Sequence, residues 1–496
     1  MVISNPIYFI ALPLIAAFLL PLIGKVYKPL IRIFPGLVFA FMAYISFDLF
    51  LNLQAGEAKI IQIAGWEQPW GINLVYGHFS GFITLIITTL AFLVWVYSYK
   101  FKKVGFDNSQ KFFILLMLMV AGSIGVVLTG DIFNLFVFIE ITAISSYGLT
   151  AFYKGRDGAE AAFKFLLIGA LSSTFLLLGI LILYTQTGTL NMAELAVKIK
   201  TIEPATQALV LILFFVGFGI EAEMFPLNGW VPDAYSQAPA PVAAAFAGML
   251  AKSGIYGLVR IIYTIFDLNG IFGLLLIMGL LTMVIAETAA LKQKNIRRML
   301  AYSSMGQMGL IMIAFSLNTK SGIYAALFLM FNHAVIKTML FFSAGFLTYT
   351  TKNKKISDLD GFGKIMPFTA LMFGLGAFAI VGFPPFSGFW SKISVLVATA
   401  DKGFYLVLAT ILITSIVEIV YYFKIIGRLY FKKAHKEVEV HKPSWNAQIA
   451  MLILAVIIIT IGIYPDLITG YITNAADALF DKAAYIKHVL PNLTLN

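Results

Sequence analysis

Six ionisable side chains lie inside apolar stretches of the chain, where a charge is costly to hold. They are Glu140, Lys252, His333, Lys337, Lys392 and Glu418. An ionisable group in hydrocarbon costs about 3 kcal/mol on insertion scales unless it is paired or hydrated. A buried carboxyl, amine or imidazole can be neutral, paired or in contact with water, and a proton relay uses the exchange between these states. These residues therefore predict a path for protons across a membrane.

His333 and Lys337 are four residues apart and share one face of a helix, so they predict one relay unit. Nothing else in the sequence offers a competing chemistry. Ser303 and Ser304 lack the Gly-x-Ser-x-Gly pattern of a hydrolase and its His-Asp partners, so we interpret them as polar contacts between helices. With no Cys, phosphate loop or metal cluster in the sequence, we expect no catalytic, redox, metal or cofactor site in this chain.

The elements that hold these residues must be membrane helices. The chain is 60% apolar and 12% charged, whereas a soluble domain is roughly half apolar and about a quarter charged. This composition excludes a soluble enzyme, a coiled coil and a disordered chain. Apolar runs of about 20 residues, the length of a membrane-crossing helix, recur from Ile7 to Ile472. They predict an all-α polytopic membrane protein with about fourteen transmembrane helices, the first of them at 7–23 in place of a removable signal peptide.

The distribution of Lys and Arg among the loops predicts the orientation of the chain in the membrane. Most of the 35 Lys and Arg residues fall in one set of alternate short loops, which excludes a nucleic-acid surface. Because positive loops stay in the cytoplasm, we expect loop 427–446 inside and both termini outside.

Two proline motifs interrupt apolar runs at matching places. Residues 225–230 read FPLNGW, and residues 383–390 read FPPFSGFW. Proline removes a backbone donor and interrupts a helix, and paired interruptions point to the transport site of a carrier with inverted repeats. We therefore expect two broken helices, at Pro226 and at Pro384 and Pro385.

The repeat divides the chain. The expected divisions are 1–111 for helices one to three, 112–265 for the first half (helices four to eight), 266–431 for the second half (helices nine to thirteen) and 432–496 for a loop and helix fourteen.

Several stretches resemble one family. Residues 130–140, 225–232, 238–252, 301–309, 331–337 and 382–392 are similar to the antiporter-like subunits of respiratory complex I, the multisubunit Mrp cation/proton antiporters and the membrane-bound hydrogenases. The resemblance runs from about residue 83 to 431 and is strongest to the Mrp D-subunit type. It implies fourteen transmembrane helices, a five-helix inverted repeat and proton translocation along a central polar axis. It also implies a prokaryotic plasma membrane and other membrane subunits as partners.

The resemblance assigns roles to four residues. The family's helix-five glutamate falls on Glu140, its helix-eight lysine on Lys252, its helix-eleven histidine on His333 and its helix-twelve lysine on Lys392.

One position departs from the family pattern. The family has a lysine five residues before the helix-seven proline, where this chain has Glu221, and its histidine two residues after that proline is Asn228. The family's ion pair would then be replaced by a carboxylate cluster of Glu140, Glu221 and Glu223. Because neighbouring carboxylates cannot all ionise cheaply, either one holds a proton or a cation such as Na⁺ bridges them.

Two functional classes follow. The chain is either an ion-translocating subunit or a non-transporting membrane scaffold that retains the fold. The first would move H⁺, with Na⁺ as a second candidate ion, in an Mrp antiporter or in a hydrogenase or related reductase complex. A carrier of organic solutes ranks third, because the motifs show no solute pocket. The expected partners are membrane subunits, the transported ions and the lipid bilayer.

Overall fold

The structure is a computed structural model that describes residues 5–53, 57–100, 106–266, 270–433 and 443–491. Most of these residues are helical. The long helices are α1 (Tyr8–Val26), α2 (Leu30–Leu51), α3 (His78–Ser98), α4 (Phe106–Leu128), α5 (Ile132–Thr150), α6 (Arg156–Thr187), α8 (Pro204–Glu221), α11 (Ala251–Thr264), α12 (Gly270–Lys292), α13 (Ile296–Ser316), α14 (Lys320–Thr350), α16 (Pro367–Val381), α17 (Ser387–Asp401), α18 (Tyr405–Phe431) and α19 (Trp445–Ile463). Short helices lie between them, among them α7 (Met192–Lys198) and α15 (Phe362–Ile365).

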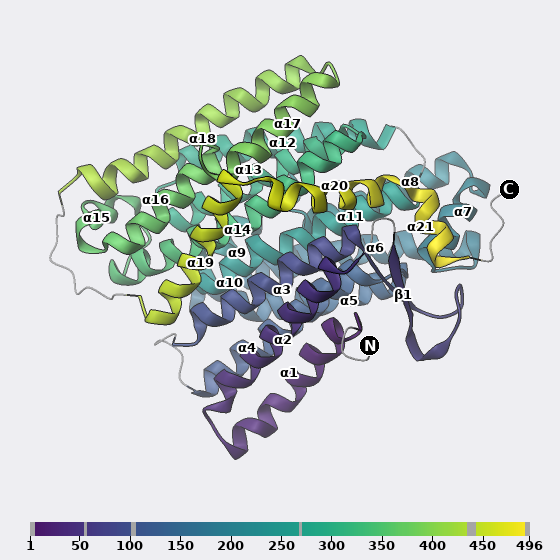
Figure 1. The fold of residues 1–496 in the computed structure, drawn as a ribbon, viewed down its shortest axis with the longest axis horizontal. Coiled ribbons are helices and arrows are strands. Elements are labelled where there is room, and N and C mark those ends of the chain that lie inside the picture. The colour runs from purple at the N-terminus through teal and green to yellow at the C-terminus, as the bar shows by residue number, and fades with distance from the viewer. Residues whose placement is uncertain (1–4, 54–56, 101–105, 267–269, 434–442, 492–496) are drawn as a thin grey trace.

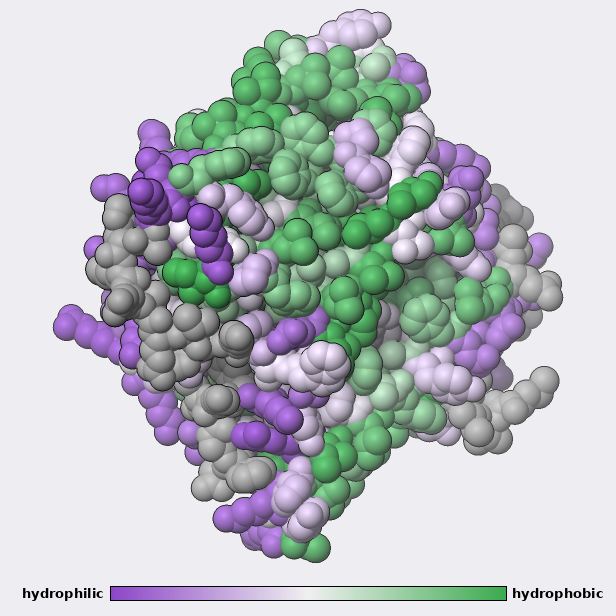
Figure 2. Space-filling model, turned by 60° about the vertical axis from the view of Figure 1, so that its left-hand side comes forward, coloured by the Kyte–Doolittle hydropathy of each residue, from purple (hydrophilic) through white to green (hydrophobic). Residues whose placement is uncertain are grey.

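Thirteen helices in the described ranges are long and apolar enough to cross a membrane, with α10 (Ala240–Ala245), η3 (Phe246–Leu250) and α11 joined as one. The remaining predicted crossing, the twelfth in chain order, is divided between α16 and α17. The polytopic all-α fold is therefore confirmed. Figure 2 shows a broad apolar belt on the surface between two hydrophilic margins, as a membrane-embedded protein requires.

Both predicted helix breaks are present. Helix α8 ends at Glu221 and α9 (Val231–Gln237) resumes the path, while α16 ends at Val381 and α17 begins at Ser387. Each proline motif lies in its gap, because proline cannot supply the helical N–H bond. In each half of the chain the broken helix is the fourth of five crossings, which is the order that the predicted repeat requires.

The central helices are the most buried. Helices α13 and α14 lie in the middle of the bundle, with α1 and α2 at one edge and α18 at the opposite edge (Figure 1). Side-chain caps fix where several helices begin: Asp131 accepts the N–H of Asn134 before α5, and Asn295 accepts two N–H groups before α13. Such caps satisfy donors that have no water to bind within a membrane protein.

Several elements were not predicted from the sequence. Strands β1 (Ala58–Gln62) and β2 (Asn73–Gly77) form an antiparallel hairpin, with Ala58 opposite Gly77. After α19, helices α20 (Asp466–Phe480) and α21 (Lys482–Val489) extend a segment that was expected to hold only a loop and one helix. Helix α20 packs on α3 and α14, but its fifteen residues are too few to cross a membrane. In the predicted cytoplasmic loop 427–446, residues 434–442 lie outside the described ranges.

Candidate functional site

The centre of the candidate site is a contact between three helices. Lys252 of α11 and His333 of α14 are fully buried, and the Lys252 amine hydrogen-bonds Nδ1 of His333. Lys252 also donates to the carbonyl of Ala247 at 3.0 Å, within the widened turn of η3. On the other side of the ring, His333 Nε2 lies 3.2 Å from the Ser304 hydroxyl of α13. An amine, an imidazole and a hydroxyl are thus connected without a gap.

Lys337 continues this arrangement one turn along α14. Its fully buried amine donates to the Ser303 hydroxyl at 2.7 Å and to the Tyr422 hydroxyl of α18 at 3.1 Å. The two hydroxyls are themselves 3.1 Å apart. The interpretation of Ser303 and Ser304 as interhelical contacts agrees with these bonds, and each serine touches one of the two predicted relay residues.

The second helix break supplies the next contact. The Lys392 amine forms an ion pair with Glu418 of α18 and donates to the carbonyl of Val381 at 3.0 Å. Val381 is the last residue of α16, and such terminal carbonyls lack a helical partner. Gln307 of α13 donates to the other Glu418 oxygen at 2.9 Å. The break thus provides a free carbonyl oxygen as a hydrogen-bond acceptor for Lys392. The Lys392 side chain is 11% exposed and the Glu418 side chain is 2% exposed.

Glu287 is a functional candidate that the sequence analysis missed. It is buried on α12, accepts a hydrogen bond from the Tyr421 hydroxyl at 2.8 Å, and interacts electrostatically with Glu418, Lys392 and Lys337. Gly306 of α13 makes room for it, because a Cβ there would collide with the Glu287 carboxyl. The available signal was a carboxyl within an apolar run, five residues before the helix ends at Lys292.

The first half of the site holds Glu140 and Glu221. Glu140 of α5 is half-buried and accepts a hydrogen bond from Ser173 of α6. Glu221 ends α8, is 4% exposed, interacts electrostatically with Glu140, and has one carboxyl oxygen without a hydrogen-bond partner. Among the described residues, no ion pair includes either carboxyl.

The expected cluster of three carboxylates is wrong for Glu223, which has other partners. The backbone of Glu223 has a left-handed φ of 61°, which turns the chain after α8. Its carboxyl accepts from the Tyr235 hydroxyl and interacts electrostatically with Lys252 and Lys337, not with Glu140. In the ranges that the structure describes, no three acidic or histidine side chains are grouped to hold a metal ion. Glu223 is instead a counter-charge of Lys252, whereas Lys337 interacts more strongly with Glu418 and Glu287.

Close packing of two helices of the first half brings Lys252 to the first helix break. Gly254 of α11 lies against the end of α8, where a Cβ would be 2.5 Å from the carbonyl oxygen of Glu221. Only glycine permits this approach, and it places Lys252, two residues earlier, beside the first helix break. The predicted residues therefore form two groups. Glu140 and Glu221 interact in the first half. The second group is joined by contacts and electrostatic interactions and comprises Lys252, His333, Lys337, Lys392 and Glu418.

Known proteins resemble the chain over nearly its whole length. The family model described as NADH:quinone oxidoreductase/Mrp antiporter, TM, matches residues 129–418. The NADH-quinone oxidoreductase subunit N of Desulforudis audaxviator is 34% identical over 86% of each chain. The D-type subunit of the Na(+)/H(+) antiporter of Alkalihalophilus pseudofirmus is 29% identical over 97% of this chain and 98% of that protein.

A solved structure shares the fold closely. A chain of the membrane-bound sulfane sulfur reductase, an archaeal respiratory membrane complex, is 40% identical and superposes with a TM-score of 0.92 over 98% of this chain and 100% of its own. The arrangement of helices is therefore common to both chains over nearly their whole length.

Proposed function

Because the chain belongs to the NADH:quinone oxidoreductase/Mrp antiporter family of ion-translocating membrane subunits, we propose that the ion it moves is the proton. The observation that best supports this proposal is the continuous chain of hydrogen bonds from Lys252 through His333 to Ser304. Lys337, one turn away on α14, leads on to Tyr422 and to the carboxyls of the second half. Each group can both accept and release a proton, which a relay requires.

The central step uses groups in contact with one another. A proton on the Lys252 amine passes to His333 Nδ1, the imidazole releases its other proton from Nε2 to the Ser304 hydroxyl, and Ser304 passes its own proton to the Glu223 carboxyl. The Glu223 carboxylate stabilises the protonated Lys252 amine, so Lys252 can hold a proton until His333 accepts it. The amine is protonated again when the next proton arrives from the side of Glu221 and Glu140.

Na⁺ is less suited to this path. A hard cation needs several oxygen ligands, and the described residues provide no group of three acidic or histidine ligands. Only the pair of Glu140 and Glu221 remains a candidate for cation contact, so we place any Na⁺ dependence in the first half.

The driving force comes from partners. Structures that resemble this chain are subunits of multi-subunit membrane complexes. Glu140 is half-buried on α5, and Ile144, one turn along, is 63% exposed, which suits a site completed by another membrane subunit. We propose a place in the plasma membrane of a prokaryote, with any redox cofactor held by another subunit. Ion flux in vesicles carrying the complete complex tests this function, since a scaffold would show flux independent of Lys252 and Lys392.

Glu221→Lys is expected to change the cation dependence of transport without collapsing the fold. Glu221 has an unpartnered carboxyl oxygen and interacts electrostatically with Glu140, so a lysine there would return an opposite charge to Glu140. Transport is measured against external Na⁺ in both forms, with Glu203→Lys at the exposed start of α8 as the matched control. An identical Na⁺ response in wild type and Glu221→Lys would remove the cation role and leave Glu221 as a protonated residue.

Single cysteines are expected to report both termini outside. The natural chain has no Cys, so one introduced thiol is the only target for a membrane-impermeant maleimide. Lys200 and Lys355 are both exposed. The loop of Lys200 is predicted outside the cell and that of Lys355 in the cytoplasm. In intact cells Lys200→Cys should be labelled, and Lys355→Cys only after the membrane is opened. The reverse pattern would invert the orientation.

A further inference from the structure

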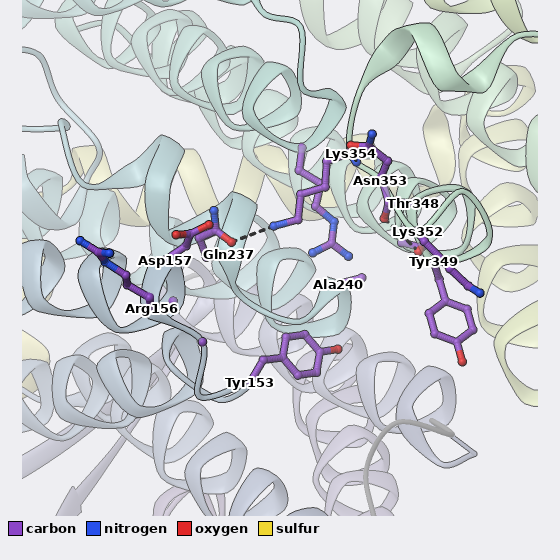
Figure 3. Close-up of a pocket in the computed structure, with 14 residues that line it drawn as sticks. Tyr153, Arg156, Asp157, Gln237, Ala240, Thr348, Tyr349, Lys352, Asn353 and Lys354 are labelled. Carbon is purple, nitrogen blue, oxygen red and sulfur yellow. Dashed lines mark hydrogen bonds between the residues drawn. The ribbon is translucent and has the colours of Figure 1, made fainter.

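A cavity of about 460 Å³ opens on the predicted cytoplasmic face, away from the ion path. Its walls come from the connection between α5 and α6, the junction of α9 and α10, the start of α13 and the C-terminal end of α14. Figure 3 shows Lys354 reaching towards Gln237 on one side of the open space, with Tyr153 and Tyr349 further round it. The cavity therefore lies where the two halves of the chain meet.

The wall carries an uneven charge. Arg156, Arg297, Lys352 and Lys354 line the cavity, against the single carboxylate of Asp157. Among the ion pairs of the described residues, none joins any of these four cations to an acidic side chain. Four positive side chains thus line one space that a single carboxylate accompanies, with Arg156 and Lys352 at its exposed margin (Figure 3).

Arg297 is the deepest of these groups. It is 8% exposed, and one terminal nitrogen donates to the carbonyl of Ala238 at 2.9 Å. Its Nε is buried and has no hydrogen-bond partner. A buried donor left unsatisfied is destabilising, and more so when it is charged. An anion in the cavity would supply the missing acceptor.

Lys354 is also affected by the excess of positive charge in the cavity wall. It lies in the connection after α14, where its amine donates to the Gln237 side chain at 2.8 Å. Burial first and Arg297 second lower the pKa of Lys354, and Asp157 opposes both effects, which together leave this pKa at about 8. The positive charge of Arg297 thus acts on the Lys354 amine, and an anion between the two groups would offset it.

We propose that this cavity binds a phosphate group, supplied either by the headgroup of an anionic phospholipid or by free phosphate. Arginine and lysine are the side chains that bind phosphate oxygens, and basic pockets between membrane helices on the cytoplasmic side bind anionic headgroups. The volume lies within the range of small-molecule sites. The bound group joins α5 and α6 of the first half to α13 and α14 of the second.

Native mass spectrometry of the full chain, purified with its accompanying subunits, tests the proposal. The probes are dioctanoyl phosphatidylglycerol, dioctanoyl phosphatidylcholine as the lipid without net charge, and inorganic phosphate. Lys354→Gln removes one charge and retains a side chain that can bond to Gln237. It should weaken binding of the anionic probe about fivefold, given roughly 1 kcal/mol for each basic residue. Lys355→Gln is the matched control, because Lys355 is exposed and does not line the cavity.

The outcomes separate the two sources. Saturable binding of phosphatidylglycerol that inorganic phosphate does not displace identifies a lipid headgroup, while binding of inorganic phosphate that displaces the lipid identifies the free anion. Either result supports the site if Lys354→Gln weakens it and Lys355→Gln does not. Absence of saturable binding by both anions, equal loss in both variants, or unchanged binding in Lys354→Gln overturns the proposal.

Discussion

Lys392→Ala is expected to abolish ion-linked transport while the complex still assembles. The Lys392 amine joins Glu418 to the Val381 carbonyl at the second helix break, so it is the contact between the buried carboxyls and the broken helix. Proton transfer by a positioned side chain contributes about 10²- to 10⁴-fold, so we expect a loss of at least about 100-fold. The measurement is the initial rate of ion flux in vesicles that contain the complete complex.

The control must separate transport from stability. Removing one member of a buried ion pair costs about 3–5 kcal/mol, because the other charge is left uncompensated. Lys392→Met combined with Glu418→Gln removes both charges and should assemble, yet it should still lack transport. Lys402→Ala at the exposed end of α17 should behave as wild type. Near-normal flux in Lys392→Ala would assign Lys392 to structure.

The second large effect is expected for Lys252→Met. Methionine keeps the length of the side chain but cannot bond His333 or balance Glu223. Lys252 is the buried amine that contacts His333, so its loss would interrupt the relay at the imidazole, and we again expect a loss of about 100-fold or more. Proton flux is compared with Lys200→Met, which removes an exposed lysine between α7 and α8. Retained flux in assembled Lys252→Met would show that protons bypass the centre.

Much of this architecture could be predicted from residue type alone. Charged residues in apolar runs are rare because they are costly, which made Glu140, Lys252, Lys392 and Glu418 visible in the sequence. The helix breaks were equally accessible, since two similar proline motifs occupy matching places. The contacts of His333 with Lys252 and of Lys337 with Tyr422 required the packing of α11, α14 and α18, which the sequence does not specify.

The errors have local causes. Glu223 is two residues from Glu221, but a left-handed residue reverses the direction of the backbone, so the two carboxyls face different partners. Glu287 was overlooked because it lies near the charged end of its helix at Lys292. Helix α20 was missed because its buried face has only Ile472, Ala475, Ala476 and Leu479, a pattern too short for a crossing.

The central claim is that protons pass through the buried imidazole, and His333→Gln tests it most directly. Glutamine can still bond Lys252 and Ser304 but does not carry a proton near neutral pH, so the fold should be retained while the relay is interrupted. The complete complex is placed in vesicles with a pH-sensitive dye inside, and proton movement is recorded in wild type and variant at equal content of assembled complex. The account predicts that proton movement falls to the level of protein-free vesicles. Proton movement in His333→Gln at the wild-type rate would contradict it.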